Sequence, residues 1–203
     1  GLPDRFQTKV FLYFAKEIFD RLPERNARIL QCSSVFQEVS PQFLDTLLNT
    51  AGSAKILQEL ASRNLFVSAV YDTSRGWLYR YHQLFREFLQ SMWQERFSAA
   101  ERKQFLLLAA RACARKKYLK LAVDFFLQAK EPVLAASVLA VPGRGMMQAG
   151  KNRDLAQMLH RFPERVIQAK PWLLLFRVYS RHYSHAAENI PDLQKAEGLF
   201  RRT

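Results

Sequence analysis

The stretch Tyr79-Arg80-Tyr81-His82-Gln83-Leu84-Phe85-Arg86-Glu87-Phe88-Leu89 decides the fold of the first half of the chain. It predicts the end of a β-strand that runs directly into an amphipathic helix, because its apolar residues from Leu84 onward recur at helical spacing. His82 stands where the first turn of that helix begins. Free backbone N–H groups and the helix dipole favour an anion or a polar side chain at such a position.

The residues before this stretch predict a β-hairpin. Residues 65–71 are typical of a strand, residues 72–76 of a turn, and residues 77–81 of the returning strand. Helices are expected upstream, because Ser40-Pro41 and Gly52-Ser53 are both typical of helix starts. Helices followed by a hairpin and a closing helix together predict a winged helix.

The first half opens with further helices. Apolar side chains repeat every four residues over residues 4–22 and predict an amphipathic helix, which Pro23 ends. The next three helices are expected over residues 27–34, 41–50 and 54–64.

The second half of the sequence predicts helices throughout. Ser98 and Glu101 have the spacing of a capping box and open the first of them. Short connectors between such helices are typical of antiparallel pairs stacked into an array. No strict repeat of about 34 residues is present, so the array is tetratricopeptide-like at most. The helices are expected over residues 99–116, 119–130, 132–140, 144–149, 153–161 and 171–185, with a last one starting near Pro191.

Three further segments carry a resemblance to one family. They are Phe19-Asp20-Arg21-Leu22-Pro23-Glu24, then Ile56-Leu57-Gln58-Glu59-Leu60 with Asn64-Leu65-Phe66, and Lys170-Pro171-Trp172-Leu173-Leu174-Leu175. With the His82 stretch, this ordered series resembles LuxR-type ATP-dependent transcriptional regulators related to the maltose-regulon activator. These regulators are signal-transduction NTPases with numerous domains. The resemblance extends from about residue 10 to the end of the chain, although none of the short motifs is exclusive to the family.

The resemblance implies a mainly α-helical chain in three parts. Residues 1–24 would be a lead-in helix from a preceding NTPase module, and residues 25–97 a winged-helix domain with a small β-hairpin. Residues 98–203 would begin an α-helical, tetratricopeptide-like repeat region. The chain would relay effector binding and nucleotide state to a DNA-binding domain. Expected partners are the NTPase and DNA-binding domains of the same protein, a small-molecule effector, and a second copy in self-association.

These residues by themselves are expected to hold no nucleotide. They contain no GxxxxGK[ST] phosphate loop, and the chain stops inside a periodic segment, so we expect a central fragment of a longer cytoplasmic protein. ATP or ADP would bind to the full-length protein, and DNA would bind only through the domain outside this chain. No paired carboxylates stand out, so we expect no enzymatic activity.

Two interpretations apply to His82. A histidine at a strand–helix junction is most often a structural cap. The resemblance implies instead that His82, in the pattern His-x-Leu-x-x-x-Phe-Leu, reaches the phosphates of bound ADP in the full-length protein and holds its resting state closed. An imidazole N–H can donate a hydrogen bond to a phosphate oxygen.

Residues near the later helices are candidates for an effector or partner site. Trp172, Arg177, Tyr179 and Arg181 would supply stacking and anion contacts in a groove of the helical array. The other interpretation of Trp172 is a core residue, because it opens an apolar run behind Pro171.

Basic charge is concentrated in the second half. Residues 1–97 carry 12 Lys and Arg against 10 Asp and Glu, whereas residues 98–203 carry 19 against 8, within a net charge of +13. This charge fits either a nucleic-acid surface or the solvated face of amphipathic helices. A nucleic-acid-binding module that uses the winged helix or the basic second half is therefore the alternative function.

The remaining reactive residues predict little chemistry. Cys32 and Cys113 lie on apolar stretches and are expected to be buried free thiols, as in a reducing cytoplasm. His182 and His185, three positions apart, are either surface residues or a metal pair that lacks further ligands, so no metal site is expected. No apolar run is long enough to span a membrane.

Overall fold

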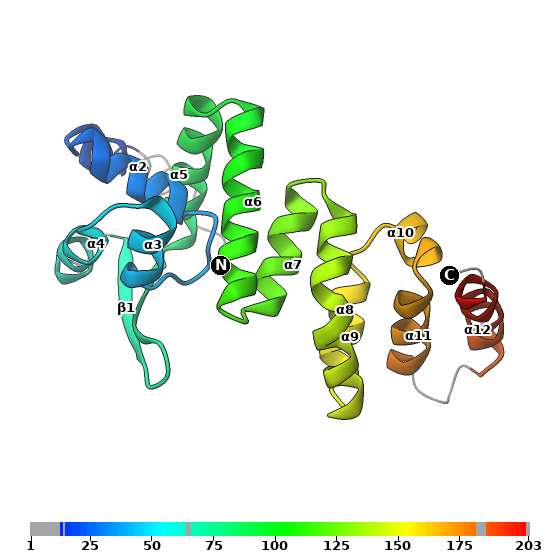
Figure 1. Ribbon diagram of the computed structural model, residues 1–203. Coiled ribbons are helices and arrows are strands. Elements are labelled where there is room, and N and C mark those ends of the chain that lie inside the picture. Colours follow the sequence, from blue (N-terminus) through cyan, green and yellow to red (C-terminus); the bar gives the residue numbers. More distant parts are fainter. Residues whose placement is uncertain (1–12, 14, 64–65, 182–185, 202–203) are drawn as a thin grey trace. The chain divides into compact units, whose positions relative to one another are not determined.

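The computed structural model describes residues 13, 15–63, 66–181 and 186–201 and is shown in Figure 1. The chain divides into two compact units, residues 1–100 and residues 101–203. Its described residues are mainly α-helical, with one β-hairpin in the first unit and helices after it. This arrangement confirms the expected fold class.

In the first unit, helices precede and follow a two-stranded antiparallel hairpin. A helical segment over residues 15–20 comes first. The strand pairing begins with Val67 opposite Tyr81, and an isolated bridge joins Val39 to Tyr79 on the other edge of the returning strand. The named elements are α2 (Glu24–Ser33), α3 (Pro41–Leu48), α4 (Ser53–Ser62), β1 (Val67–Asp72), β2 (Gly76–Tyr81) and α5 (Gln83–Arg96).

Both predicted helix starts in this unit are confirmed. Pro41 is the first residue of α3, and the Ser40 hydroxyl accepts a backbone hydrogen bond from the first turn at 3.5 Å. Gly52 precedes α4 with a φ of 95°, a left-handed conformation that favours glycine. The Asp45 carboxylate accepts a hydrogen bond from the Ser53 N–H at 3.1 Å and thereby ties the start of α4 to α3.

Helix α5 buries the face that the sequence predicts. Phe85 and Leu89 are fully buried, and Phe88 is half-buried. The Phe85 ring lies 5.1 Å from the ring of Phe66 and 5.9 Å from the ring of Tyr81, measured between ring centroids. Burying one such side chain contributes roughly 1.5–3 kcal/mol, so this cluster fixes α5 against the hairpin.

In the second unit the described residues form helices joined by short turns (Figure 1). Alanines such as Ala109, Ala122 and Ala135 are fully buried between these helices and allow close packing. The elements are α6 (Ala99–Arg115), α7 (Leu119–Gln128), α8 (Pro132–Gln148), α9 (Asn152–Leu159), α10 (Glu164–Ala169), α11 (Pro171–Ser180) and α12 (Ala186–Phe200). Helix α11 packs against α8, α9, α10 and α12, and so lies at the centre of this unit.

Helix α8 is continuous, and the expected break between residues 140 and 144 is wrong. Pro142 lies inside the helix, followed by Gly143. A Cβ on Gly143 would lie 2.3 Å from the Phe176 ring, so the glycine lets α8 and α11 approach closely. The proline and glycine therefore do not end the helix, because packing against α11 overrides their low helix propensity.

Helix α2 begins at Glu24 rather than at residue 27. Further differences lie near the end of the chain. No helix is predicted from the sequence where α10 forms, a helix of only 6 residues. Helix α12 begins at Ala186 rather than near Pro191, which lies inside it. Helix α11 ends at Ser180, and residues 182–185 of the expected longer helix lie outside the described residues.

Both cysteines are free and buried, as predicted. Burial raises the pKa of the Cys32 thiol to about 11 and that of the Cys113 thiol to about 12. Since the thiolate is the nucleophile, neither cysteine is a ready nucleophile at neutral pH.

The described residues contain neither a membrane span nor a metal site. None of the helices among them is long and apolar enough to cross a bilayer. No group of three or more His, Cys, Asp or Glu in this part of the chain could hold a metal ion. His182 and His185 lie outside the described residues.

Candidate functional site

His82 joins the hairpin to α5 and is exposed. Its N–H donates to the Phe66 carbonyl at 2.7 Å, and its carbonyl accepts from the Arg86 N–H at 3.0 Å, in the first turn of α5. In the part of the chain that the structure describes, its side chain makes no capping hydrogen bond to α5. Because His82 is the N-cap residue of α5, its imidazole lies near the positive end of the helix dipole, where an anion is favoured.

The residue before His82 is anchored deep in the first unit. The Tyr81 hydroxyl and the Ser33 Oγ are 2.5 Å apart, and the Ser33 hydroxyl donates to the Leu30 carbonyl at 3.0 Å. Since a serine hydroxyl has one proton, Tyr81 is the donor of the shorter bond. Burial raises the pKa of the Tyr81 hydroxyl, which keeps it protonated as a donor. This anchor fixes the backbone from which His82 projects.

The charged residues of the hairpin bind one another and Glu38, which precedes α3. Arg75 forms ion pairs with Asp72 at 3.2 Å and with Glu38 at 3.5 Å, and Glu38 also binds Arg80. The Arg80 hydrogen bond is the main cause that holds the pKa of Glu38 below its usual value. Two cations and two carboxylates make up this network, so the hairpin presents little net charge.

Helix α4 is the element that a winged helix would place in a DNA groove, and it carries little positive charge. Lys55 is exposed, and Arg63 at the end of the helix pairs with Glu59 at 2.9 Å. Groove insertion is normally accompanied by several phosphate contacts. Helix α4 by itself is therefore poorly suited to DNA.

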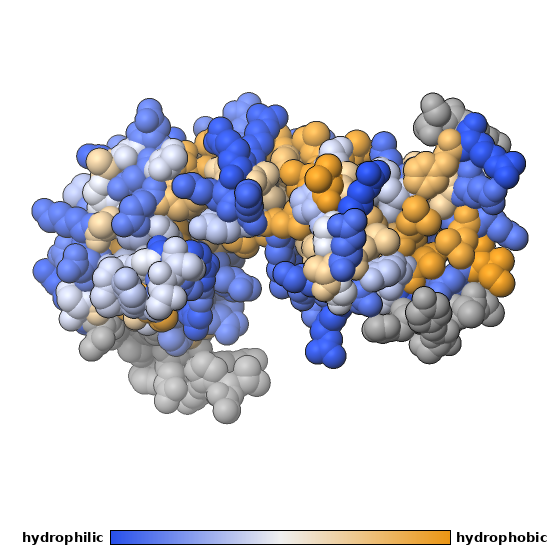
Figure 2. All heavy atoms as spheres, turned by 60° about the horizontal axis from the view of Figure 1, so that its bottom comes forward, coloured by the Kyte–Doolittle hydropathy of each residue, from blue (hydrophilic) through white to orange (hydrophobic). Residues whose placement is uncertain are grey.

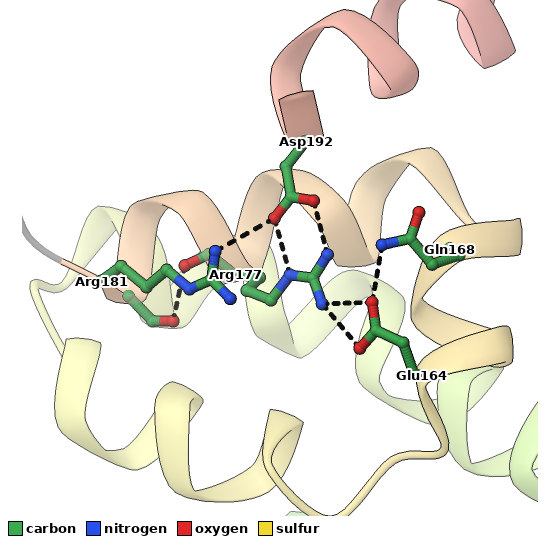
Figure 3. A network of polar contacts seen from close by, with 6 residues as sticks. Glu164, Gln168, Arg177, Arg181 and Asp192 are labelled. Carbon is green, nitrogen blue, oxygen red and sulfur yellow. Dashed lines mark hydrogen bonds and ion pairs between the residues drawn. The ribbon is translucent and has the colours of Figure 1, made fainter. Parts of the chain in front are cut away.

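Arg177 on α11 is the centre of an ion-pair network that joins three helices (Figure 3). Its Nε and Nη2 donate to Asp192 on α12 at 2.7 and 2.5 Å, and its Nη1 donates to both oxygens of Glu164 on α10 at 2.8 Å. Arg181 adds a contact to Asp192 at 3.4 Å. Hydrogen bonds from Arg177 and then from Gln168 hold the pKa of Glu164 below its usual value. All three guanidinium nitrogens of Arg177 are thus bound to carboxylates of the chain.

Of the four residues predicted for an effector or partner site, Arg177 and Arg181 lie together in this network. A recess of about 260 Å³ lies beside them. Tyr179 points elsewhere, because its hydroxyl donates at 2.7 Å to a carbonyl at the end of α8. Trp172 is half-buried and packs edge-to-face on the phenylalanine one turn later, with ring centroids 5.6 Å apart. The structure therefore does not gather the four side chains in one place.

Glu164 and Asp192 are the network residues that sequence reasoning missed. Each follows a proline, and Glu164 lies in the first turn of α10, where a carboxylate suits the helix dipole. That signal was available in the sequence. Nothing local indicates the partner, because Arg177 is 13 residues from Glu164 and 15 from Asp192.

Helix α12 buries two polar side chains and Ala196 on its inner face and carries an apolar outer strip. Asn189 and Asp192 are buried, whereas Ile190, Leu193 and Phe200 are 53%, 43% and 46% exposed. Their spacing places these three side chains along one side of the helix. Figure 2 shows hydrophobic side chains gathered at the end of the second unit that contains α11 and α12. Apolar surfaces of this kind mark sites for another helix or a partner.

Comparison with known proteins shows a similarity to MalT-like regulators. Residues 15–101 match the MalT winged helix domain. Over 181 residues, 89% of this chain, the sequence is 23% identical to the HTH-type transcriptional regulator MalT of Vibrio cholerae serotype O1. It is 22% identical over the same length to the protein of that name from Vibrio parahaemolyticus serotype O3:K6. The chain spans about a fifth of the length of these relatives, since the match covers 20% of each. Residues 15–101 are therefore similar to the MalT winged helix domain, and the chain as a whole is similar to part of MalT-like regulators.

Proposed function

We propose that this chain is the central coupling and sensing part of an ATP-dependent transcriptional regulator of the LuxR type. The winged helix domain transmits the nucleotide state of a preceding NTPase domain, and the second unit receives an effector signal. Both signals pass to a DNA-binding domain of the same protein, in the cytoplasm. The observation that carries this proposal is the match of residues 15–101 to the MalT winged helix domain.

His82 is the residue through which the winged helix domain would sense the nucleotide. The exposed imidazole stands at the start of α5, beside backbone N–H groups that favour an anion. The hydrogen bonds of Tyr81 and of the His82 backbone hold this position in place. An ADP phosphate bound by the NTPase domain would accept a hydrogen bond from the imidazole, and the domains would stay closed while the ADP remains.

The test is His82→Ala in the regulator that contains this chain. A hydrogen bond to a charged group contributes about 1.5–3 kcal/mol, so ADP affinity should fall roughly tenfold to hundredfold. Transcription without effector should rise, because the closed state loses a contact that the open state lacks. ADP retention and reporter expression are the measurements.

Gln83→Ala is the matched control, since Gln83 is the exposed next residue and bonds to Glu87 in its own helix. Equal ADP retention in the parent, the control and His82→Ala would remove the sensor role. Residues 1–203 alone should bind no ATP, which calorimetry can check.

The second unit would receive the effector around α11 and α12. In this proposal Arg177 and Arg181 act through the network that holds α12 on α11. Trp172 and Tyr179 remain candidates for direct effector contact. The apolar strip of α12 offers a surface for self-association, since its three large side chains are exposed.

A second candidate function, nucleic-acid binding, is favoured by one observation. Five exposed basic residues lie around the turn between α6 and α7: Arg111, Arg115, Lys116, Lys117 and Lys120. Such a patch would contact phosphates without reading bases, so binding should be weak and sensitive to salt. Tight, sequence-selective binding in a gel-shift assay near physiological salt would favour this candidate over the coupling role.

A further inference from the structure

A groove of about 630 Å³ runs along one face of α4 in the winged helix domain. One wall is α4 itself. The other wall comes from residues 18–26, where the first helical segment ends and α2 begins. The α4 residues that line the groove recur at intervals of three and four, so the groove follows the whole helix, about 15 Å.

The floor of this α4 groove is aliphatic. Ile56 and Leu60 are each 3% exposed, and Ile18 and Leu22 across from them are half-buried. Among the described residues that line the groove, no aromatic ring offers a stacking surface. The floor therefore fits aliphatic side chains better than nucleic-acid bases, which are held by stacking.

Both walls carry positive charge. Arg21 and Arg25 lie on one wall, Lys55 and Arg63 on the other, and all four are exposed. Glu59 is the acidic residue among the described lining residues, and it pairs with Arg63. Arg21 pairs with Glu17, four residues earlier, at 2.7 Å, so the excess of cations beside the apolar floor comes from Arg25 on one wall and Lys55 on the other.

Arg25 is held in place before any partner binds. Its Nε and Nη2 donate to the Thr50 hydroxyl at 3.1 and 2.9 Å, and its Nη2 also donates to the Ala51 carbonyl at 2.6 Å. These bonds tie α2 to the segment that leads into α4. A positioned guanidinium loses less side-chain entropy on binding a carboxylate than a mobile one.

We propose that the α4 groove docks an acidic amphipathic helix of another domain or protein. Aliphatic side chains of that helix would cover the floor, and carboxylates on its flanks would meet the cations of the two walls. This inference goes beyond the coupling role and does not depend on it. Nucleic acid fits less well, because the aliphatic floor, among the described lining residues, offers no aromatic ring on which bases could stack.

The probe is a labelled synthetic helix of about 14 residues, long enough to span the groove. It carries leucines at positions i, i+3, i+4 and i+7 and glutamates on both flanks. Fluorescence anisotropy with the 203-residue chain should show saturable binding. Arg21→Glu and Lys55→Glu, one on each wall, should each lower the affinity about tenfold, since each replaces an attraction by a repulsion.

Glu59→Gln should change the affinity in the opposite direction, raising it severalfold, because it removes the acidic group from the groove. A loss of folding cannot produce opposite signs at neighbouring positions of one helix. Lys151→Glu, exposed in the second unit, is the matched control and should leave the affinity unchanged.

Three outcomes would overturn the proposal. One is equal affinity for a control peptide in which lysines replace the glutamates. Another is binding that neither Arg21→Glu nor Lys55→Glu weakens. The third is duplex DNA of random sequence that binds more tightly than the peptide and loses affinity in Lys55→Glu, since the groove would then be a nucleic-acid surface.

Discussion

At the scale of single residues, Tyr81 shows how the winged helix domain holds His82 in position. The Tyr81 side chain is buried, and its hydroxyl crosses from the hairpin to Ser33 in α2, 48 residues away in sequence. Its ring also packs against Phe85, on the next turn of α5. One side chain, adjacent to His82 in the sequence, thus connects a strand and two helices.

Tyr81→Phe should destabilise the first unit by about 1 kcal/mol, because it removes one net hydrogen bond and leaves the ring packing intact. Urea unfolding of the two variants gives this difference. Tyr71→Phe is the control, since Tyr71 is 62% exposed and should change stability little. A Tyr81→Phe variant as stable as the parent would mean that the hydroxyl bond contributes no net stability.

The position of His82 between strand and helix could be predicted from the sequence, whereas the hydrogen bond that anchors the neighbouring Tyr81 could not. A change from strand to helical spacing at residue 82 is a local signal, and the structure has it there. The Tyr81–Ser33 bond depends on how the fold brings distant segments together, so no pattern around either residue indicates it. The same holds for Arg177 and its two carboxylates.

At the scale of elements, Gly143 sets how closely α8 and α11 pack. Gly143→Ala would place a Cβ 2.3 Å from the Phe176 ring, and relieving that overlap should cost about 1–3 kcal/mol. Gly145→Ala, two residues along, meets nothing within 4 Å and should stabilise the helix by about 0.5–1 kcal/mol. Thermal unfolding should therefore shift in opposite directions. Equal shifts would show that the ring moves aside freely.

Asp192 should govern how firmly α12 is held. The Asp192 carboxylate accepts two hydrogen bonds from Arg177, and both side chains are little exposed. Asp192→Asn should therefore lower the free energy of unfolding by about 1.5–3 kcal/mol. Hydrogen exchange in α12 should become faster, while α7 and α8 stay protected. Lys195→Gln, on an exposed part of α12, is the control. Unchanged exchange in Asp192→Asn would show that apolar contacts hold the helix.

Helix starts were predicted better than helix interiors, for a physical reason. Ser40-Pro41 acts through its own backbone and first turn, so its effect can be inferred locally. Pro142 and Pro191 favour breaks locally, but both lie inside helices of the structure. Packing of α8 and α12 against α11 decides these cases, and packing cannot be inferred from the residues on either side of a proline.

At the scale of the whole molecule, both units should lose stability in acid. The pKa of Glu38 in the first unit and that of Glu164 in the second are held below their usual values by arginine hydrogen bonds. A carboxyl with a lowered folded pKa stabilises the fold at pH values above its unfolded pKa, about 4.3. This contribution is lost as the pH falls from there through the folded pKa.

The midpoint temperature of thermal unfolding should therefore fall as the pH is lowered through this range. Glu38→Gln and Glu164→Gln should each make the profile flatter, because an amide does not titrate. Each substitution removes one of the two contributions, and the double variant should show the flattest profile. Parallel profiles in all variants would assign the acid sensitivity to other groups.

Two carboxylates bind all three guanidinium nitrogens of Arg177, and this constrains how the sequence can change over time. A guanidinium that is 12% exposed and has two carboxylate partners cannot lose one of them without leaving charge poorly compensated. Substitutions at residues 164, 177 and 192 should therefore be correlated among related chains. Lineages that lose either acid should have replaced the arginine by an uncharged residue, and those that keep the arginine should retain both acids.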